Sequence, residues 1–140
     1  MISTIYLEDA VASPPRAQAL LARFADAMVI PIDRYGPVVN RRSQSFRLQK
    51  AKPALIIAEK HRGHVLPTPP TYGIGAEANF YFSHMFNCLY DCRYCFLQGM
   101  YQSAHYLLFV NYDDFFAAID ARLEAHPEGP VHFFSGYDCD

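Results

Sequence analysis

The chain contains the run Cys88-Leu89-Tyr90-Asp91-Cys92-Arg93-Tyr94-Cys95, in which three cysteines follow the spacing C-x3-C-x2-C. Three thiolates on one short loop can converge on an iron–sulfur cube while backbone N–H groups face its sulfides. The fourth iron then has no cysteine from this loop, and an open coordination position binds a substrate or cofactor, as at catalytic zinc. The spacing therefore favours a [4Fe-4S] cluster; a zinc site lacking one ligand and three reduced core thiols are the alternatives.

Length and composition exclude several classes of protein. The chain has 140 residues, of which 51% are hydrophobic and 19% charged, enough for one small packed domain. No apolar run approaches the ~18 residues that span a bilayer. The N-terminal residues 1–9 lack the basic region of a secretory signal. Four cysteines are too few for a disulfide scaffold. We expect a cytoplasmic protein that is neither disordered, fibrous nor membrane-spanning.

Charge is divided unevenly along the chain. Residues 1–62 hold ten of the twelve Lys and Arg against five acids, whereas residues 63–140 hold two bases against nine acids. The basic segment 34–62 contains eight bases and the single acid Glu59. It is interpreted either as a solvated edge ribbon or as a phosphate-binding strip. The strip would contact DNA through five residues: Arg41, Arg42, Arg47, Lys50 and Lys52.

Apolar periodicity predicts a mixed α/β chain. Short strands are expected at 5–7, 28–32, 79–83, 105–110 and 131–136, and helices at 16–27 and 111–126. The strand at 105–110, the helix at 111–126 and the strand at 131–136 follow one another, which implies a parallel crossover unit.

A Pro/Gly linker is expected at 67–77, beginning with Pro67-Thr68-Pro69-Pro70. Its end, Gly73 to Ala78, fits the G-x-G-x-x-A string of dinucleotide sites. That fingerprint needs a preceding strand and a helix that begins within it, whereas here a proline linker precedes and a strand follows. The match is therefore rejected.

The cysteine spacing, with Tyr94 directly before the last cysteine and a strand before the loop, resembles the radical S-adenosylmethionine (AdoMet) superfamily. The resemblance implies that Cys88, Cys92 and Cys95 hold a [4Fe-4S] cluster whose fourth iron is chelated by AdoMet. In that superfamily one electron from the cluster cleaves AdoMet to a 5'-deoxyadenosyl radical, which abstracts a substrate hydrogen. It also implies an electron donor such as flavodoxin or ferredoxin.

Residues around the cysteines narrow the resemblance. The run Cys92-Arg93-Tyr94-Cys95-Phe96-Leu97-Gln98, followed by a strand ending in Val110-Asn111, is similar to the spore photoproduct lyase family. Its lyases split a thymine lesion in DNA back to two thymines, which would give the basic segment a phosphate backbone to contact.

The resemblance also implies an architecture. The fold class is α/β: a small lead-in at 1–66, the linker at 67–77, and at 78–140 the N-terminal part of a partial (βα)6 barrel with a cluster loop at 84–98. Six strand–helix units need roughly 190 residues, so we expect the barrel to be incomplete in this chain.

The end of the strand at 131–136 carries further candidate site residues. Ser135, Gly136, Tyr137 and Asp138 stand in the place of the superfamily's Gly-Gly-Glu-like motif, which implies that they bind the methionine amino group of AdoMet. Tyr94 is expected to contact its adenine. Cys139 lies close to the place of the lyase's hydrogen-donating cysteine; a semi-buried thiol without that role is the alternative.

One departure from the lyase pattern leaves other functions open. Phe96 stands where the lyase has a tyrosine thought to relay a hydrogen atom, and a phenyl ring has no transferable O–H hydrogen. This favours radical chemistry on a modified nucleotide or a peptide. A non-enzymatic cluster- or zinc-binding nucleic-acid module is a further alternative. His84 and Asn87 are expected to bond the cluster's sulfurs or the loop backbone, and His61 and His64 to lie on the surface.

Overall fold

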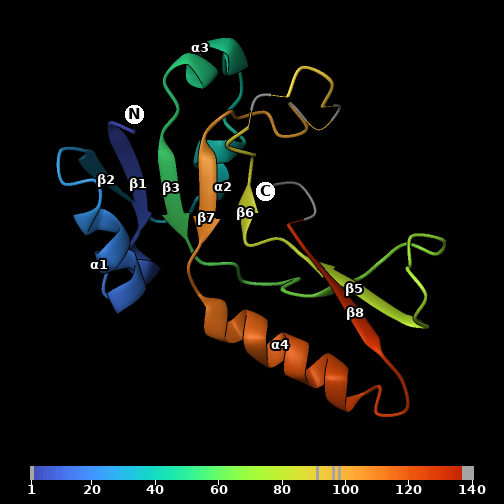
Figure 1. Cartoon of the computed structure of the whole chain (residues 1–140). Helices are drawn as coiled ribbons and strands as arrows, with labels where there is room; N and C mark the ends of the chain where they lie inside the picture. The colour runs from blue at the N-terminus through green and yellow to red at the C-terminus, as the bar shows by residue number, and fades with distance from the viewer. Residues whose placement is uncertain (1, 91, 96, 98, 137–140) are drawn as a thin grey trace.

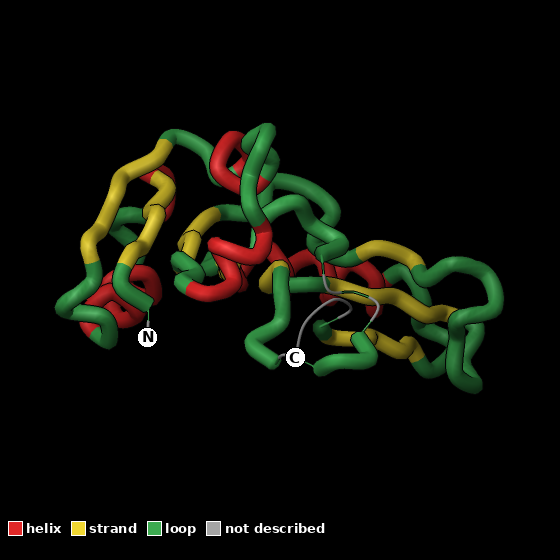
Figure 2. The backbone as a smooth tube through the Cα atoms, turned by 90° about the horizontal axis from the view of Figure 1, so that it is seen from above, coloured by secondary structure: helices red, strands yellow, loops and turns green. Residues whose placement is uncertain are grey.

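The structure is a computed structural model of the chain, and it describes residues 2–90, 92–95, 97 and 99–136. The described strands form two sheets, a five-stranded sheet in the order β2-β1-β3-β7-β6 and a three-stranded sheet in the order β4-β5-β8 (Figure 1). Seen from above, the strands of the two sheets lie toward opposite ends of the molecule (Figure 2). The chain is therefore a mixed α/β fold with parallel pairing in both sheets.

The first sheet is built around β3 (Leu55–Ala58), whose four residues are all buried. A short, continuous apolar strand of this kind is typical of the interior of a parallel sheet. It pairs in parallel with β1 (Thr4–Glu8) and β7 (Tyr106–Phe109); β1 also pairs in parallel with β2 (Met28–Ile32). At the other edge, β6 (Met85–Phe86) pairs antiparallel with β7.

Helices cover both faces of this sheet. On one face, η1 (Asp9–Val11) and α1 (Pro15–Ala22) pack onto Ile5, Leu7 and Ile57. On the other, α2 (Gly36–Val39) and the first turn of α4 (Tyr112–Glu124) pack onto Ile56 and Leu107. Each fully buried Ile or Leu contributes about 2 kcal/mol, so this core holds the first sheet in place.

The second sheet pairs β5 (Ala78–Phe82) in parallel with β8 (Val131–Ser135), and β4 (Leu66–Pro67) antiparallel with β5. Helix α4 leads from β7 to the start of β8 (Figure 1). Acidic residues in its first turn, Asp113 and Asp114, and Arg122 in its last turn complement the helix dipole.

The predicted pairing of the strands at 105–110 and 131–136 is wrong. β7 pairs with β3 of the first sheet, and β8 pairs with β5 of the second. The parallel crossover therefore joins β5 to β8, with α4 as its helix. Hydrogen bonds between β3 and β7 also connect the predicted lead-in (1–66) with the predicted barrel segment (78–140). The sequence does not reveal this pairing, because it depends on contacts between residues far apart in the chain.

The basic segment 34–62 is not an edge ribbon. It contains α2, the short helix α3 (Phe46–Ala51) and the buried central strand β3. Two smaller differences concern element ends: α1 ends at Ala22 instead of continuing to Ala27, and Pro67 belongs to β4. None of the helices in the described part of the chain is long and apolar enough to cross a membrane.

Candidate functional site

The cluster loop (84–98) leaves the second sheet at the end of β5 and is held against the first. Ser83, directly after β5, is buried, and its carbonyl accepts a hydrogen bond of 3.1 Å from the Lys60 ammonium. The amide of Phe109 donates to the carbonyl of His84 at 2.8 Å. The loop thus starts where the two sheets meet.

Asn87 closes the base of the loop. Its side-chain amide donates to the carbonyls of Ser103 and His105, both at 2.7 Å, so it joins the residue before the first cysteine to the chain that returns after the loop. Asn87 has φ +63°, a left-handed conformation that asparagine tolerates better than most residues. Both acceptors lie outside residues 84–98, so the expected bond from Asn87 to the backbone of the loop itself stays a prediction. His84 instead lies edge-on to the ring of Tyr112.

The three cysteines of the loop are half-buried, and none forms a disulfide. The amide of Tyr90 lies 3.3 Å from the Cys88 sulfur, and the amide of Cys95 donates to the Cys92 carbonyl at 3.0 Å in a tight turn. Among the described residues, no group of three or more His, Cys, Asp or Glu is close enough to hold a single metal ion. A cube instead spreads its thiolate ligands over its corners, and backbone N–H groups bond its sulfurs. The three thiols and the N–H donor at Cys88 have the chemistry that such a cluster requires.

The ends of β5 and β8 form the other side of the site. Ser135 lies opposite Phe82 in the parallel register, and the amide of Gly136 donates to the Phe82 carbonyl at 3.1 Å. Gly136 has φ +73°, which a residue with a side chain adopts only at a cost. The structure therefore brings Ser135 and Gly136 to the strand end from which the cluster loop departs.

Other predicted site residues are placed only in part. Tyr94 lies in the loop with 90% of its surface exposed. Tyr137, Asp138 and Cys139 lie outside the described residues, as does Phe96. Their proposed contacts stay predictions.

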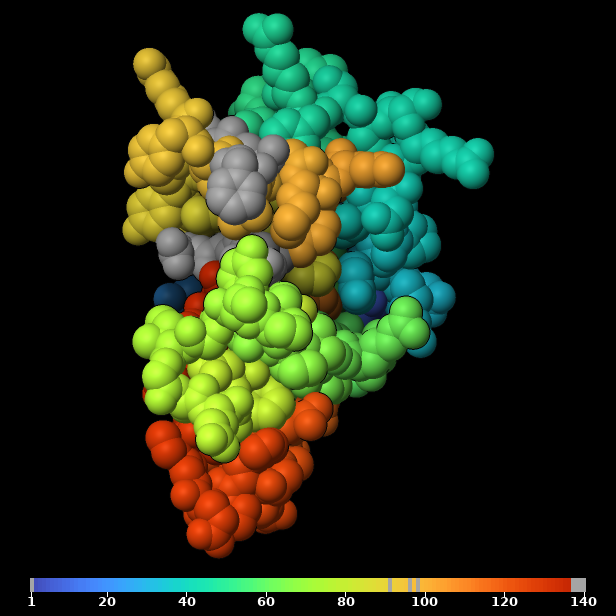
Figure 3. Space-filling model, turned by 90° about the vertical axis from the view of Figure 1, so that its right-hand side faces the viewer, coloured from blue at the N-terminus to red at the C-terminus, as the bar shows by residue number. Residues whose placement is uncertain are grey.

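Helix α3 lies beside the cluster loop across a small cavity, an arrangement that the sequence did not predict. Phe46 and Lys50 of the helix line a small cavity together with Cys88 and Tyr90. The side-chain oxygen of Gln49 accepts a hydrogen bond of 2.9 Å from the amide of Ala104, just after the loop. Figures 1 and 3 show α3 and the loop at the same end of the molecule, opposite α4.

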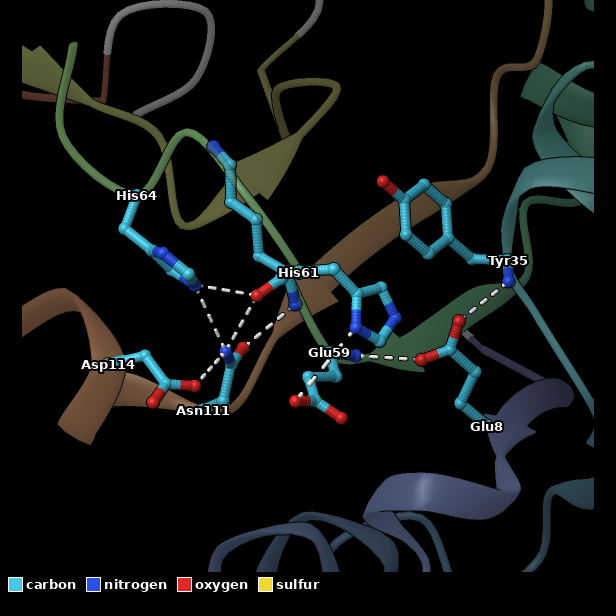
Figure 4. Close-up of polar contacts among 8 residues, drawn as sticks. Glu8, Tyr35, Glu59, His61, His64, Asn111 and Asp114 are labelled. Atoms are coloured by element: carbon cyan, nitrogen blue, oxygen red, sulfur yellow. Dashed lines mark hydrogen bonds and ion pairs between the residues drawn. The ribbon is translucent and has the colours of Figure 1, made fainter.

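A buried carboxylate lies at the end of β1. Glu8 is fully buried; its two oxygens accept hydrogen bonds from the amides of Tyr35, at 2.8 Å, and Glu59, at 2.9 Å (Figure 4). Burial, with a smaller contribution from the Glu8 charge, raises the pKa of Tyr35. Glu8 thus links the end of β1, through hydrogen bonds, to the segments that follow β2 and β3. The sequence signal that could have identified Glu8 is a carboxylate at the end of an apolar strand.

Asn111, which lies between β7 and the start of α4, bonds the segment that follows β3. It accepts from the amide of Lys60 and donates to its carbonyl, both at 2.9 Å, and also donates to Asp114 at 2.6 Å (Figure 4). His64 donates from Nε2 to the same Lys60 carbonyl at 2.6 Å and packs edge-on against Phe115. His64 is therefore half-buried and structural, not a surface residue.

Solved structures of spore photoproduct lyase have a similar fold. A cysteine-to-serine variant superposes with a TM-score of 0.76 at 19% identity, and the complex with dinucleoside spore photoproduct with 0.74 at 18%. A double variant with bound AdoMet and dinucleoside spore photoproduct gives 0.76 at 20%. Each match covers 100% of this chain and 41% of the lyase, so the chain spans about two fifths of the lyase's length. Neither a protein-family profile nor a curated protein sequence matches the chain. The chain thus shares the α/β fold of part of spore photoproduct lyase.

Proposed function

We propose that this chain binds the cluster and cofactor of a radical AdoMet enzyme that acts on a thymine lesion in DNA. One observation carries the proposal: a loop with three cysteines leaves the end of β5 beside the end of its parallel partner β8, in a fold shared with spore photoproduct lyase. A solved structure of that lyase contains AdoMet and the dinucleoside lesion. Ligands bind at the C-terminal ends of parallel strands, where this loop begins.

Cys88, Cys92 and Cys95 would hold a [4Fe-4S] cluster in the first strand–helix unit of a partial (βα)6 barrel. With AdoMet bound, the cluster would supply the one-electron reductive cleavage that starts hydrogen abstraction. The cysteines' task is to hold three irons and leave the fourth open to the cofactor. Asn87 supports them by fixing both ends of the loop.

Ser135, Gly136, Tyr137 and Asp138 would bind the methionine amino group of AdoMet. An ammonium group donates hydrogen bonds, so it needs acceptors. The amide of Gly136 is a donor and already bonds the Phe82 carbonyl. Carbonyl oxygens and the Ser135 hydroxyl at this strand end are the groups suited to the task. Tyr94 would contact the adenine, and Cys139 would donate a hydrogen atom to the product radical.

A different substrate is the second candidate. Phe96 lacks the hydroxyl that the lyase family carries at this position, which favours a modified nucleotide or a peptide as the target. The AdoMet chemistry and the roles of the three cluster cysteines would be the same.

The test is anaerobic turnover of the reconstituted protein with AdoMet, dithionite and DNA that contains the lesion. Chromatography would measure 5'-deoxyadenosine and the loss of the lesion. We expect the natural sequence to form 5'-deoxyadenosine and to remove the lesion, and Cys92→Ala to do neither. Cys139→Ala should cleave AdoMet without repairing the lesion. AdoMet cleavage by the natural sequence with the lesion intact would support the second candidate. No cleavage at all would contradict the radical function itself.

A further inference from the structure

The end of the molecule that carries α3 is strongly basic. Between Asp33 and Glu59 the chain has six Lys and Arg and no acid. Five of these bases are exposed: Arg34, Arg41, Arg42, Arg47 and Lys52. A surface segment of one charge sign attracts macromolecules of the opposite sign and accelerates their association.

This basic segment borders the cysteine loop at Cys88. Lys50 and Phe46 line the same small cavity as Cys88. Large apolar side chains are exposed on the same two segments: Leu89 and Tyr90 are 63% and 66% exposed on the loop, and Leu48 is 73% exposed on the side of α3 that points away from the cavity. The α3 segment and the loop therefore carry exposed bases and exposed apolar side chains, next to the first proposed ligand of the cluster. We call this region the α3 face; it comprises 41–52 and 88–90.

The α3 face and the proposed cofactor site approach the loop from different sheets. Helix α3 belongs to the connection between β2 and β3 of the first sheet, whereas Ser135 and Gly136 end β8 of the second sheet (Figure 1). A partner on α3 would thus reach the cysteine loop without occupying the strand ends at which AdoMet is proposed to bind.

We propose that the α3 face docks an acidic one-electron carrier protein, of the flavodoxin type, that reduces the cluster. The inference rests on the proposed function, because radical AdoMet chemistry needs one electron delivered to the cluster. In the transfer, the carrier is oxidised by one electron and the cluster is reduced by one, and no covalent bond forms or breaks.

The physical features of the face suit such an encounter. Electron-transfer complexes are weak and bury less than about 1,200 Å², so a short helix and a loop suffice. Their association is driven by charge complementarity, and charges at the rim act mainly on the association rate and its salt dependence. A DNA backbone would also be attracted to these bases. The exposed Leu89 and Tyr90 of the loop, and the cavity that Lys50 lines together with Cys88, favour a protein that must come close to the cluster.

The test compares two double variants with the same change of charge. Arg47→Glu/Lys52→Glu reverses two exposed bases of the α3 face, and Arg23→Glu/Arg62→Glu reverses two exposed bases elsewhere in the chain. Binding of oxidised flavodoxin to the cluster-free protein is measured by calorimetry at low and high salt. The rate of cluster reduction is then followed by stopped-flow absorbance, with reduced flavodoxin and, separately, with dithionite.

We expect flavodoxin binding to the natural sequence to weaken steeply with salt. Arg47→Glu/Lys52→Glu should weaken binding, and slow flavodoxin-driven reduction, by about tenfold or more. The Arg23→Glu/Arg62→Glu control should stay close to the natural sequence, and dithionite should reduce all three proteins at the same rate, because a small chemical reductant needs no docking surface.

Equal flavodoxin binding by the two variants would overturn the proposal. So would a loss of affinity for a DNA oligonucleotide in Arg47→Glu/Lys52→Glu with flavodoxin binding unchanged, since the face would then be a DNA contact. If instead no cluster forms in the natural sequence, the proposed function fails, while flavodoxin binding to the cluster-free protein still decides whether the face docks the carrier.

Discussion

Replacing Asn87 should release the base of the cluster loop. Its amide donates two hydrogen bonds of 2.7 Å, to the carbonyls of Ser103 and His105, and no other residue type offers two donors at this reach with the same tolerance for φ +63°. Asn87→Ala removes both bonds and leaves a β-carbon in a left-handed conformation. Asn87→Gly removes the bonds but fits the backbone.

The expected loss in the free energy of unfolding has two sources, the hydrogen bonds of Asn87 and its backbone conformation. A net contribution of about 1 kcal/mol per hydrogen bond gives about 2 kcal/mol for the pair. The left-handed conformation adds about 1 kcal/mol for alanine and nothing for glycine. We therefore expect a loss of about 3 kcal/mol in Asn87→Ala and about 2 kcal/mol in Asn87→Gly. Asn40→Ala, at an exposed asparagine with φ −99°, is the matched control.

Urea denaturation of the cluster-free protein, followed by circular dichroism, measures the free energy of unfolding. Hydrogen exchange of the amides in 88–106 measures local opening of the loop if the global transition does not report it. The reasoning would be refuted if Asn87→Ala and Asn87→Gly resembled Asn40→Ala in both measurements. Equal losses in Asn87→Ala and Asn87→Gly would refute the backbone contribution alone.

Three further predictions concern single residues of the fold. Glu8→Gln should cost about 2 kcal/mol in urea denaturation, because one of two buried backbone N–H groups loses its charged acceptor; an unchanged midpoint would contradict this. Burial lowers the pKa of His105, whose Nδ1 accepts from the Ala54 amide. As the pH falls, the unfolded chain therefore takes up a proton on this histidine before the folded chain does. The free energy of unfolding should keep its full value above about pH 6.5 and decrease below it, until the pH reaches the lower pKa of the folded state. His105→Asn keeps a hydrogen-bond acceptor but cannot take up the proton, so its free energy of unfolding should decrease less between pH 7.5 and 5.5. The same pH dependence in the variant and the natural sequence would argue against this. Gly136→Ala should cost about 1–2 kcal/mol from its positive φ and weaken AdoMet binding measured by calorimetry, whereas Ala at the neighbouring Ser135 should spare stability.

Local sequence patterns predicted most of the elements but not their assembly. The amphipathic helix at 111–126 and the strands at 28–32 and 131–136 correspond to α4, β2 and β8 within a few residues. The central strand β3 was missed because its four apolar residues stand inside a segment whose charge dominated the interpretation. The pairing of β7 with β3 depends on burial between distant parts of the chain, which strand order does not reveal.

The candidate site shows the same contrast: its local features were predictable from the sequence, whereas its tertiary contacts were not. Cysteine spacing alone indicated the cluster loop, because ligand spacing is a local property of the chain. Asn87 was singled out as a neighbour of the loop, but its two carbonyl partners lie across the loop and could be identified only in the fold. The cavity that α3 and Cys88 line together depends on tertiary packing in the same way. The roles proposed for Tyr137, Asp138 and Cys139 remain predictions from the resemblance.

Cluster assembly tests the central claim most directly. After anaerobic reconstitution with iron and sulfide, the natural sequence should bind about four irons and four sulfides and absorb near ~400 nm, with bleaching by dithionite. Cys88→Ala, Cys92→Ala and Cys95→Ala should each lose the absorbance, and Cys139→Ala should keep it. A protein that binds one zinc without sulfide, or a Cys88→Ala variant with an intact cluster, would contradict the account.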